Sequence, residues 1–376
     1  MRIIISCGGT AGHINPALAI ADKIKELQEQ TDIAFVGSKN GMENSLVSRA
    51  GYPIWGIDVM GFKRSLSLSN VKAVIKTAAA VKQASKLIEE YSPDAVIGTG
   101  GYVCYPMLKA ASKMGVYTVL HESNAIPGLA VRVLAKKMDQ VFVSYDMCAR
   151  KLDLKGRCVL SGNPVRRCVD LISHEQARER LGMSGRYRYL ILSFGGSLGA
   201  KTVNDCALEV MESLSSKRSD ILHVHSYGRS GIGGFTEEFK RRGYDRCRNI
   251  VAAEYIYDMP TYMRAADVVM SRSGAMTLSE IASSGVASVL IPSPNVTNDH
   301  QYKNAQEFAS QGAAFVIDEK KDGATSNAVK YITELITDRE KREAMAKSAT
   351  LFSHPEAADV IAKNILSRSP DLLFKH

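Results

Sequence analysis

The sequence predicts an α/β protein built from two Rossmann-like lobes, and three observations support this fold class. The chain has 376 residues, which is more than one ordinary domain contains. Short β-rich runs alternate with longer helical segments in both halves, a pattern typical of βαβ units and parallel sheets. Each half opens with a buried strand, a glycine-rich turn and a helix, and the two turns read Gly8-Gly9-Thr10-Ala11-Gly12 and Gly195-Gly196-Ser197-Leu198-Gly199.

The predicted strands follow one another at regular intervals. They cover residues 2–6, 33–36, 95–98, 117–121 and 140–144 in the first half, and residues 189–194, 221–225, 250–253, 268–270 and 287–291 in the second. The halves join near residues 160–164, where a strand runs into a non-helical Gly-Asn-Pro turn. We therefore expect a first lobe at residues 1–162 and a second lobe at residues 163–354. The tail, residues 355–376, is expected to form a helix that can pack back on either lobe, and we assign it to the first.

The composition is that of a globular protein that forms a hydrophobic core, because 45% of the residues are apolar and 23% are charged. The seven cysteines are scattered, with no Cys-x-x-Cys pair and no metal-ligand spacing, which indicates reduced thiols in a reducing compartment. The first residues read as a strand rather than a secretory signal, and no run of about 18 apolar residues could span a bilayer. We expect a cytoplasmic protein.

The positive charge is concentrated in the first half. Residues 1–163 carry 20 Lys and Arg against 13 Asp and Glu, whereas residues 164–376 carry 28 against 26. A basic lobe suggests an anionic partner, such as nucleic acid, a phospholipid surface or a phosphorylated substrate. Charge alone does not separate these partners from ordinary solubilising charge.

The glycine turns suit phosphate groups. A glycine turn that leads into a helix offers unpaired N–H groups and the positive end of the helix dipole. Neither turn fits the P-loop pattern or the dinucleotide fingerprint, and a third glycine turn follows the strand that ends near residue 98. Each could be only a tight connection. However, ligands of open α/β sheets bind at the carboxyl ends of strands, so three such turns favour a phosphate role.

Polar residues are expected at the same strand ends. His13 follows the first glycine turn at the start of a helix, where the dipole lowers its proton affinity and favours a neutral base. A capping or packing role is the alternative for this histidine. Glu280 is placed to reach a ribose diol, or only to complement a helix dipole. The chain has no Asp-x-Asp pair to hold a metal, so helix N-termini and an arginine would have to stabilise a departing diphosphate.

Seven motifs in this order resemble the MurG family, which adds N-acetylglucosamine to lipid I in peptidoglycan synthesis. The resemblance covers about residues 3–310. The motifs are Gly8-Gly9-Thr10-Ala11-Gly12-His13-Ile14-Asn15-Pro16-Ala17, Gly100-Gly101-Tyr102, His121-Glu122-Ser123-Asn124, Gly162-Asn163-Pro164-Val165-Arg166, Gly195-Gly196-Ser197-Leu198-Gly199-Ala200, Arg272-Ser273-Gly274-Ala275-Met276-Thr277-Leu278-Ser279-Glu280 and Gln301-Tyr302-Lys303-Asn304-Ala305.

The resemblance implies the glycosyltransferase-B fold, two Rossmann-like lobes facing across a cleft. It implies an inverting transfer, without metal or cofactor, from UDP-N-acetylglucosamine to the muramoyl 4-hydroxyl of lipid I. His13 is then the likeliest general base. The implied acceptor-binding residues are Gly9, Gly100, Gly101 and Tyr102. The implied donor-binding residues are Thr10, Gly12, Asn124, Arg166, Ser197, Ile256, Met276, Thr277, Glu280, His300 and Gln301, with backbone near Ile256 reading uracil and Glu280 the ribose.

The sequence departs from the family pattern at three places. Ala11 stands where the family usually has Gly, Ser123 where it usually has Gln, and His300-Gln301 where it often has Gln-Gln. These departures weaken the roles assigned to residue 11 and to His300. Three rival interpretations remain: a glycolipid synthase of similar fold, a nucleotide-sugar epimerase, and a non-catalytic nucleotide-sugar sensor. An epimerase would need carboxylates poised for elimination, and a sensor would need no base.

A membrane-facing segment is expected in the first lobe, because lipid I is a membrane lipid. Residues 71–86 place Val71, Val74, Ile75, Ala78 and Val81 on one helical stripe beside Lys72, Lys76, Lys82 and Lys86. Such a stripe can lie in the interface of an anionic bilayer. An ordinary core-facing helix is the alternative. We expect peripheral binding to the cytoplasmic face of the membrane and no nucleic-acid partner.

Overall fold

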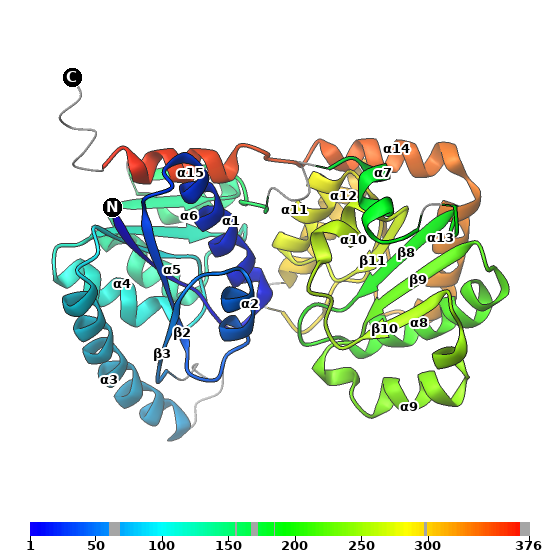
Figure 1. Cartoon of the computed structure of the whole chain (residues 1–376), viewed down its shortest axis with the longest axis horizontal. Helices are drawn as coiled ribbons and strands as arrows, with labels where there is room; N and C mark the ends of the chain where they lie inside the picture. Colours follow the sequence, from blue (N-terminus) through cyan, green and yellow to red (C-terminus); the bar gives the residue numbers. More distant parts are fainter. Residues whose placement is uncertain (60–67, 155, 167–171, 184, 297–298, 369–376) are drawn as a thin grey trace. The chain divides into compact units, whose positions relative to one another are not determined.

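The computed structural model of the chain divides into two compact units, which are described separately (Figure 1). The first comprises Met1–Arg166 and His354–His376, and the second Arg167–Ser353. The structure describes the chain except residues 60–67, 155, 167–171, 184, 297–298 and 369–376, and except the side chains of residues 68–75. Part of the predicted tail helix, and the side chains of Val71, Lys72, Val74 and Ile75, lie outside the described residues.

The first unit is built on a seven-stranded parallel sheet with the order β3-β2-β1-β4-β5-β6-β7. Residues alternate between its two faces: Ile3 and Ile5 contribute to one hydrophobic cluster and Ile4 to the other. The strands are β1 (Arg2–Ser6), β2 (Asp32–Ser38), β3 (Ile54–Ile57), β4 (Ala95–Gly98), β5 (Tyr117–Glu122), β6 (Gln140–Val143) and β7 (Cys158–Leu160).

Helices cover both faces of this sheet. One face packs against α3 (Leu68–Tyr91), α4 (Cys104–Lys113), α5 (Leu129–Leu134) with the short helix η1 (Ala135–Lys137), and α6 (Asp146–Leu152). The other packs against α1 (Ala11–Leu27), α2 (Glu43–Arg49) and α15 (Ala357–Leu366). Helix α15 lies beside α1 (Figure 1), where the buried Lys23 ammonium lies 3.4 Å from the Asp359 carboxylate. Helix α15 therefore belongs to the core of the first unit.

The second unit contains a six-stranded parallel sheet with the order β10-β9-β8-β11-β12-β13. Its strands are β8 (Tyr189–Phe194), β9 (Ile221–Ser226), β10 (Ile250–Ala253), β11 (Val268–Ser271), β12 (Ala287–Leu290) and β13 (Phe315–Val316). Helices α8 (Lys201–Ser213), α9 (Gly234–Arg241) and α13 (Ala324–Thr337) cover one face. The other face is covered by α7 (His174–Arg180), α10 (Met259–Ala265), α11 (Ala275–Ser284) and α12 (His300–Ser310), while α14 (Arg339–Thr350) adds buried residues to both.

The observed elements confirm the predicted fold class of two parallel α/β units. Ten of the thirteen strands match predicted ranges within two residues at either end. β7 coincides with the strand expected before the Gly-Asn-Pro turn. β3 and β13 were not predicted, because β3 is a partly exposed edge strand and β13 has only two residues. Within the described part of the chain, no helix has the length and apolarity to cross a membrane.

Candidate functional site

Two glycine turns meet in the first unit. One follows β1 and the other follows β4, and these strands are neighbours in the sheet, so the turns leave the same edge side by side. A Cβ on Gly101 would lie 2.2 Å from the carbonyl oxygen of Gly8, so only glycine permits this contact. The structure thus brings together the predicted acceptor residues from two distant parts of the sequence.

His13 lies in the first turn of α1, against the second glycine turn. Its Nδ1 lies 3.1 Å from the carbonyl oxygen of Gly8, which can only accept a hydrogen bond. Nδ1 therefore carries the proton in the neutral ring, and Nε2 presents a lone pair. Gly100 borders that nitrogen, because a Cβ there would lie 2.4 Å from Cδ2 and 2.9 Å from Nε2 of His13. Burial lowers the pKa of His13, an effect that the nearby carboxylates of Glu122 and Glu43 partly oppose.

Thr10, Gly9 and Tyr102 complete this group. Thr10 precedes α1 in an extended conformation, and its Oγ1 lies 3.5 Å from Nδ1 of His13. A Cβ on Gly9 would lie 3.4 Å from the Tyr102 ring, which is partly exposed. Gly12 lies within the first turn of α1 and has open space around it apart from Thr10. The predicted residues Gly9, Gly12, Gly100, Gly101 and Tyr102 therefore all lie in the two glycine turns or beside His13.

A buried carboxylate supports the first glycine turn, and sequence reasoning missed it. Glu43 is fully buried and accepts hydrogen bonds from the amide of Ser38 (2.7 Å), the hydroxyl of Ser38 (2.6 Å) and the amide of Gly9 (3.4 Å). The Gly9 amide therefore faces the interior of the unit. Gly8, Gly37 and Gly41 crowd this carboxylate, since a Cβ on any of them would lie within 2.7 Å of a Glu43 atom. These three glycines are the sequence signal from which the buried position of Glu43 could have been inferred.

Asn124 is held by Glu122 at the carboxyl end of β5. One carboxylate oxygen of Glu122 accepts from both the amide and the side-chain nitrogen of Asn124, each at 2.9 Å. The other oxygen accepts from the amide of Gly128 at 2.9 Å. Glu122 therefore shapes the loop between residues 122 and 128, which fixes the side chain of Asn124.

Arg166 belongs to the first unit. Its guanidinium makes two contacts of 2.9 Å with the Asp22 carboxylate of α1. Both side chains are about one-third exposed, so this ion pair is open to solvent. The predicted second lobe begins at residue 163 and so includes Arg166. In the structure, the first unit extends to Arg166.

In the second unit, the remaining predicted residues follow the carboxyl ends of neighbouring strands. The segment around Ile256 follows β10, the Gly195–Gly199 turn follows β8, and the segment leading to α11 follows β11. His300 and Gln301 begin α12, after β12. Since parallel strands end at one edge, these segments line that edge in the order of the sheet.

The N-terminus of α11 is suited to bind a diphosphate. Gly274 caps this ten-residue helix in an extended conformation, and Met276 and Thr277 lie in its first turn. The first-turn amides of a helix have no partner within the helix, and the dipole places positive charge there. β11 pairs with β8, with Ser271 opposite Phe194, so the turn that contains Ser197 lies beside this helix. Two sets of backbone donors therefore lie next to each other.

Glu280 and Ile256 come from different segments that lie close together. Ile256 is buried, and the side chain of the adjacent Tyr255 interacts electrostatically with the Glu280 carboxylate. Burial raises the pKa of Tyr255 to about 12, and the Glu280 carboxylate adds to this rise. A base bound along residues 254–256 would therefore have its ribose near Glu280.

Gln301 is already held by its own loop. Its side-chain oxygen accepts from the amide of Ser293 at 2.9 Å, and its carbonyl oxygen accepts from the Ser273 hydroxyl at 2.8 Å. These bonds join the segments after β11 and β12. His300 precedes it at the start of α12, where Asp299 adopts a left-handed conformation with φ of 49°. Among the described residues, no group of three His, Cys, Asp or Glu side chains is arranged to hold a metal ion.

Two parallel α/β units with glycine turns at the carboxyl ends of their strands form the glycosyltransferase-B fold, and comparisons with known proteins show that the chain is a glycosyltransferase. The glycosyltransferase family 28 N-terminal domain matches residues 3–143, and the glycosyltransferase family 28 C-terminal domain matches residues 190–361. The structure of MurG from Acinetobacter baumannii is similar with a TM-score of 0.67, at 26% identity over 97% of this chain and 99% of that one. A UDP-GlcNAc 2-epimerase from Neisseria meningitidis has the same score at 14% identity, over 98% and 100% of the two chains, which shows a shared fold.

Curated relatives identify the family. An enzyme of Acetivibrio thermocellus is 42% identical over 361 residues, which cover 96% of each chain. A relative from Bacillus thuringiensis is 37% identical over 96% of this chain and 97% of its own. The chain belongs to their family, the UDP-N-acetylglucosamine--N-acetylmuramyl-(pentapeptide) pyrophosphoryl-undecaprenol N-acetylglucosamine transferases.

Proposed function

We propose that this enzyme transfers N-acetylglucosamine from UDP-N-acetylglucosamine to the muramoyl 4-hydroxyl of lipid I, with inversion and without a metal ion. The observation that carries the proposal is the environment of His13. The Gly8 carbonyl keeps the proton of the neutral ring on Nδ1, and Nε2 borders a glycine turn that leaves room for a substrate. A neutral imidazole in this state can accept a proton from an attacking hydroxyl.

The second unit supplies the donor site in this proposal. The first-turn amides of α11 at Met276 and Thr277, with the turn at Ser197, bind the diphosphate. Glu280 binds the ribose, and the backbone near Ile256 binds uracil. Gln301 and His300 at the start of α12, with Asn124, contact the sugar.

The reaction then proceeds by in-line displacement. The acceptor oxygen attacks the anomeric carbon as its proton passes to Nε2 of His13. The bond from the anomeric carbon to the diphosphate oxygen breaks, and UDP leaves with that electron pair. The helix N-termini and the Arg166 guanidinium stabilise the new negative charge, which is the role a metal ion has in other transferases. Gly100, Gly101 and Tyr102 hold the acceptor pyrophosphate near the base, and Gly9, whose amide is bonded to Glu43, leaves room for it.

A transfer assay tests the reaction. Labelled UDP-N-acetylglucosamine and a lipid I analogue are incubated with the enzyme, with and without EDTA, and the linkage of the product is determined by NMR. We expect label in the lipid fraction at equal rates in both samples, and a β-linkage from an α-linked donor. Loss of transfer in EDTA would contradict the metal-independent step, and absence of transfer in both samples would leave a nucleotide-sugar sensor as the better interpretation.

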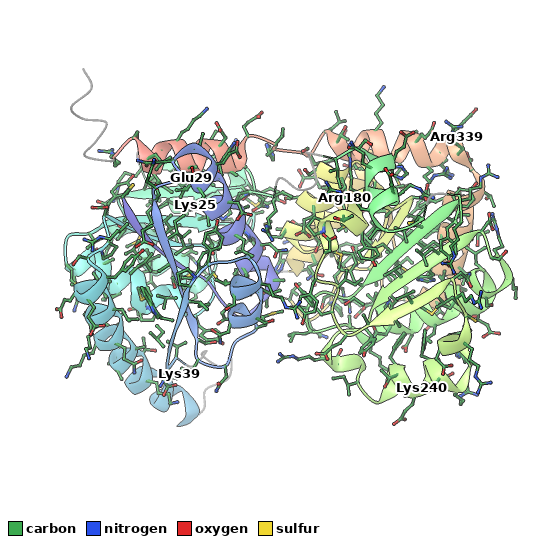
Figure 2. The ribbon with its side chains drawn as sticks, in the orientation of Figure 1. Lys25, Glu29, Lys39, Arg180, Lys240 and Arg339 are labelled. Atoms are coloured by element: carbon green, nitrogen blue, oxygen red, sulfur yellow. The ribbon has the colours of Figure 1, made fainter. Side chains whose placement is uncertain are left out.

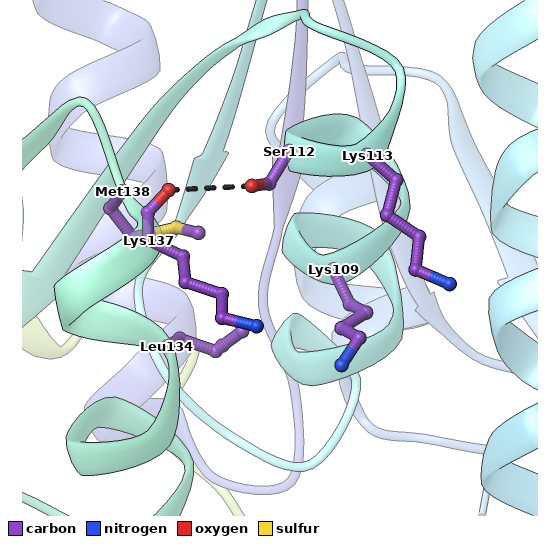
Figure 3. Close-up of a pocket in the computed structure, with 6 residues that line it drawn as sticks. All are labelled: Lys109, Ser112, Lys113, Leu134, Lys137 and Met138. Atoms are coloured by element: carbon purple, nitrogen blue, oxygen red, sulfur yellow. Dashed lines mark hydrogen bonds between the residues drawn. The ribbon is translucent and has the colours of Figure 1, made fainter.

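We also propose that the first unit binds the cytoplasmic face of an anionic membrane, where its lipid acceptor resides. A pocket with a volume of about 80 Å³ lies between α4 and the α5–η1 segment (Figure 3). The apolar side chains of Leu134 and Met138 line it, together with Lys109, Lys113 and Lys137. The Ser112 hydroxyl joins the two walls by donating to the carbonyl of Lys137 at 3.3 Å.

Apolar side chains lie exposed on the adjoining α5. Leu129 is 67% exposed and Val133 is 51% exposed, so α5 presents two apolar side chains to the surroundings. Lysines beside exposed apolar side chains match the interface of an anionic bilayer. In the described part of the predicted stripe on α3, Ala78, Lys82 and Lys86 are exposed, whereas Val81 packs against the core. The α4–α5 face therefore adds to the stripe that the sequence indicated.

Vesicle binding tests the membrane proposal. The variant in which Lys109, Lys113 and Lys137 become glutamate should lose most of its binding to vesicles of phosphatidylglycerol, because each lysine adds about 1 kcal/mol near an anionic surface. The matched control changes the exposed Lys217, Lys240 and Lys347 of the second unit to glutamate; Figure 2 labels Lys240 on α9. Equal binding by both variants, or wild-type binding that does not weaken with salt, would refute the proposal.

A further inference from the structure

A row of buried polar side chains crosses the second unit behind the Gly195–Gly199 turn. It consists of Ser215, His223, Ser193, His225 and Asn204, and none of them is more than 4% exposed. The pairing of β8 with β9 places Ser193 opposite His225, so both face the layer of helix α8. None of these residues has a role in the reaction proposed above. Buried polar groups are costly unless they are fully hydrogen-bonded, so their partners are informative.

The row is one continuous chain of hydrogen bonds. Ser215 Oγ lies 3.0 Å from His223 Nδ1, and His223 Nε2 lies 2.9 Å from Ser193 Oγ. Ser193 Oγ lies 2.8 Å from His225 Nδ1, and His225 Nε2 lies 3.1 Å from Asn204 Oδ1. Asn204 Nδ2 then donates to the carbonyl oxygen of Tyr227 at 3.1 Å.

Only one direction of donation fits these distances. The Tyr227 carbonyl accepts, so the Asn204 amide turns its oxygen to His225, whose Nε2 must donate. The Nδ1 of neutral His225 then accepts from the Ser193 hydroxyl. That hydroxyl has a single hydrogen, so Ser193 Oγ in turn accepts from Nε2 of His223. The remaining nitrogen of His223 accepts from the Ser215 hydroxyl. Every hydrogen bond in the chain is therefore donated in the same direction, from Ser215 toward Tyr227.

The last acceptor of the chain supports the glycine turn. The Tyr227 carbonyl packs against Gly199, where a Cβ would lie 2.1 Å from its oxygen. The same loop is tied to the turn by the Ser230 amide, which donates to the carbonyl of Leu198 at 2.9 Å. The Tyr227 and Gly228 amides donate to the carbonyls of Ala253 and Glu254, both at 3.0 Å. The Tyr227–Gly228 loop thus connects the turn after β8 with the segment that leads to Ile256.

We propose that this chain of hydrogen bonds positions the donor nucleotide by fixing the Tyr227–Gly228 loop. The loop in turn sets the places of the Gly195–Gly199 turn and of residues 253–256, which receive the diphosphate and the base. The inference rests on the donor site proposed above. Ser193, His223, His225 and Asn204 are positioning residues, because their side chains are buried and act on the nucleotide through the loop.

Calorimetric titration with UDP tests this role. Asn204→Ala removes the last link of the chain, and we expect its Kd for UDP to rise at least tenfold while the KM for the lipid acceptor stays within twofold of wild type. The control is Asp205→Ala on the same helix, which removes a solvent-exposed ion pair with Lys201 and should leave the Kd unchanged. Unchanged UDP affinity in a folded Asn204→Ala variant, or an equal loss for both substrates, would refute the proposal.

A second variant decides the outcome if Asn204→Ala does not fold. Gly231→Ala changes none of the side chains in the hydrogen-bond chain. Its Cβ would lie 2.9 Å from Asn204 Nδ2 and 2.8 Å from the Tyr227 Cβ, so it would displace the last link of the chain. We expect weaker UDP binding, and unchanged binding in a folded Gly231→Ala variant would also refute the proposal. UDP binding is measured without the transfer reaction. Failure of the positioning role can therefore be distinguished from failure of the proposed transfer reaction. Wild-type protein that does not bind UDP would overturn the proposed donor site itself.

Discussion

His13 depends on the carbonyl oxygen of Gly8 and on the missing side chain of Gly100 for the properties of a base. The Gly8 carbonyl selects the tautomer, and burial lowers the pKa, so that the ring is neutral near pH 7. Gly100 has a φ of 115° and borders Nε2, a combination that no other residue type could provide without covering the nitrogen. The chemistry proposed for one side chain is therefore set by the backbone around it.

Replacement of His13 by alanine should separate catalysis from donor binding. We expect kcat to fall by about 10²–10⁴, the usual contribution of a general base, while the Kd for UDP stays near the wild-type value. Steady-state kinetics and calorimetry measure the two quantities. The exposed His174 of α7 serves as a control, and His174→Ala should retain full turnover. If UDP affinity fell in proportion to kcat, His13 would be a structural or donor-binding residue.

Replacement of Gly100 by alanine should inactivate the enzyme by a steric effect. The new Cβ would lie 2.9 Å from Nε2 of His13, and a displacement of about 1 Å in a site can lower turnover by roughly 100-fold. Gly115 offers a matched control, since it also has a positive φ of 73° but has open space around it. Both variants carry backbone strain, so equal kcat values for them would exclude a specific effect at His13.

At the scale of elements, α2 supports the first glycine turn through the Glu43 side chain. This helix begins with Glu43, and the carboxylate joins the end of β2 at Ser38 to the turn after β1 at Gly9. The bonds to Ser38 are short, and the site is closed to solvent. A carboxylate that accepts from several backbone amides makes strong, charge-assisted hydrogen bonds.

The Glu43→Gln variant should destabilise the first unit and disturb the acceptor site. The glutamine NH₂ would replace one carboxylate oxygen, so its N–H donors would face either the amide of Gly9 or the two donors of Ser38, and an unsatisfied buried group costs about 1–3 kcal/mol. Denaturant unfolding measures the loss, and KM for the lipid acceptor should rise more than KM for the donor. Glu29→Gln is the control, because Glu29 lies exposed after α1, as Figure 2 shows. Equal stability of the two variants would contradict a supporting role for Glu43.

Sequence reasoning succeeded for elements whose signals are local. A buried strand followed by glycines and a helix, as at residues 2–12 and 189–199, is a continuous pattern, so the fold class and the positions of the glycine turns could be predicted. The roles of Glu43, His223 and His225 could not be predicted, because they depend on partners that are distant in the sequence and come together only in the folded chain. His225, for example, contacts Ser193, which lies 32 positions earlier. The roles assigned to individual site residues stay predictions.

At the scale of the whole molecule, each unit has its own sheet, its own core and its own buried histidines. Burial lowers the pKa of His223 and of His225 to about 3 in the second unit, and that of His121 to about 4 in the first. A histidine that is neutral when folded and has an ordinary pKa of 6.5 when unfolded favours folding above pH 6.5. This stabilisation decreases as the pH falls below 6.5, because only the unfolded state binds the proton.

Acid should therefore destabilise both units. Each such histidine lowers the free energy of unfolding by about 1 kcal/mol between pH 6.5 and 5.5, and by nearly 1.4 kcal/mol for each further pH unit, so His223 and His225 together remove roughly 2 kcal/mol between pH 6.5 and 5.5. The single tryptophan, Trp55 on β3, reports the unfolding of the first unit by fluorescence. Hydrogen exchange of the β8 and β9 amides reports the second.

The His223→Gln variant checks the cause of this slope. Glutamine can donate to Ser193 as Nε2 does, but it does not titrate, so the pH dependence of exchange in β8 and β9 should fall by about half while that of Trp55 fluorescence stays unchanged. A variant with the full wild-type slope would show that other groups cause the acid sensitivity. A change in both units would show that the two unfold together, because two independently folded cores would not transmit the loss of one titrating side chain to the other.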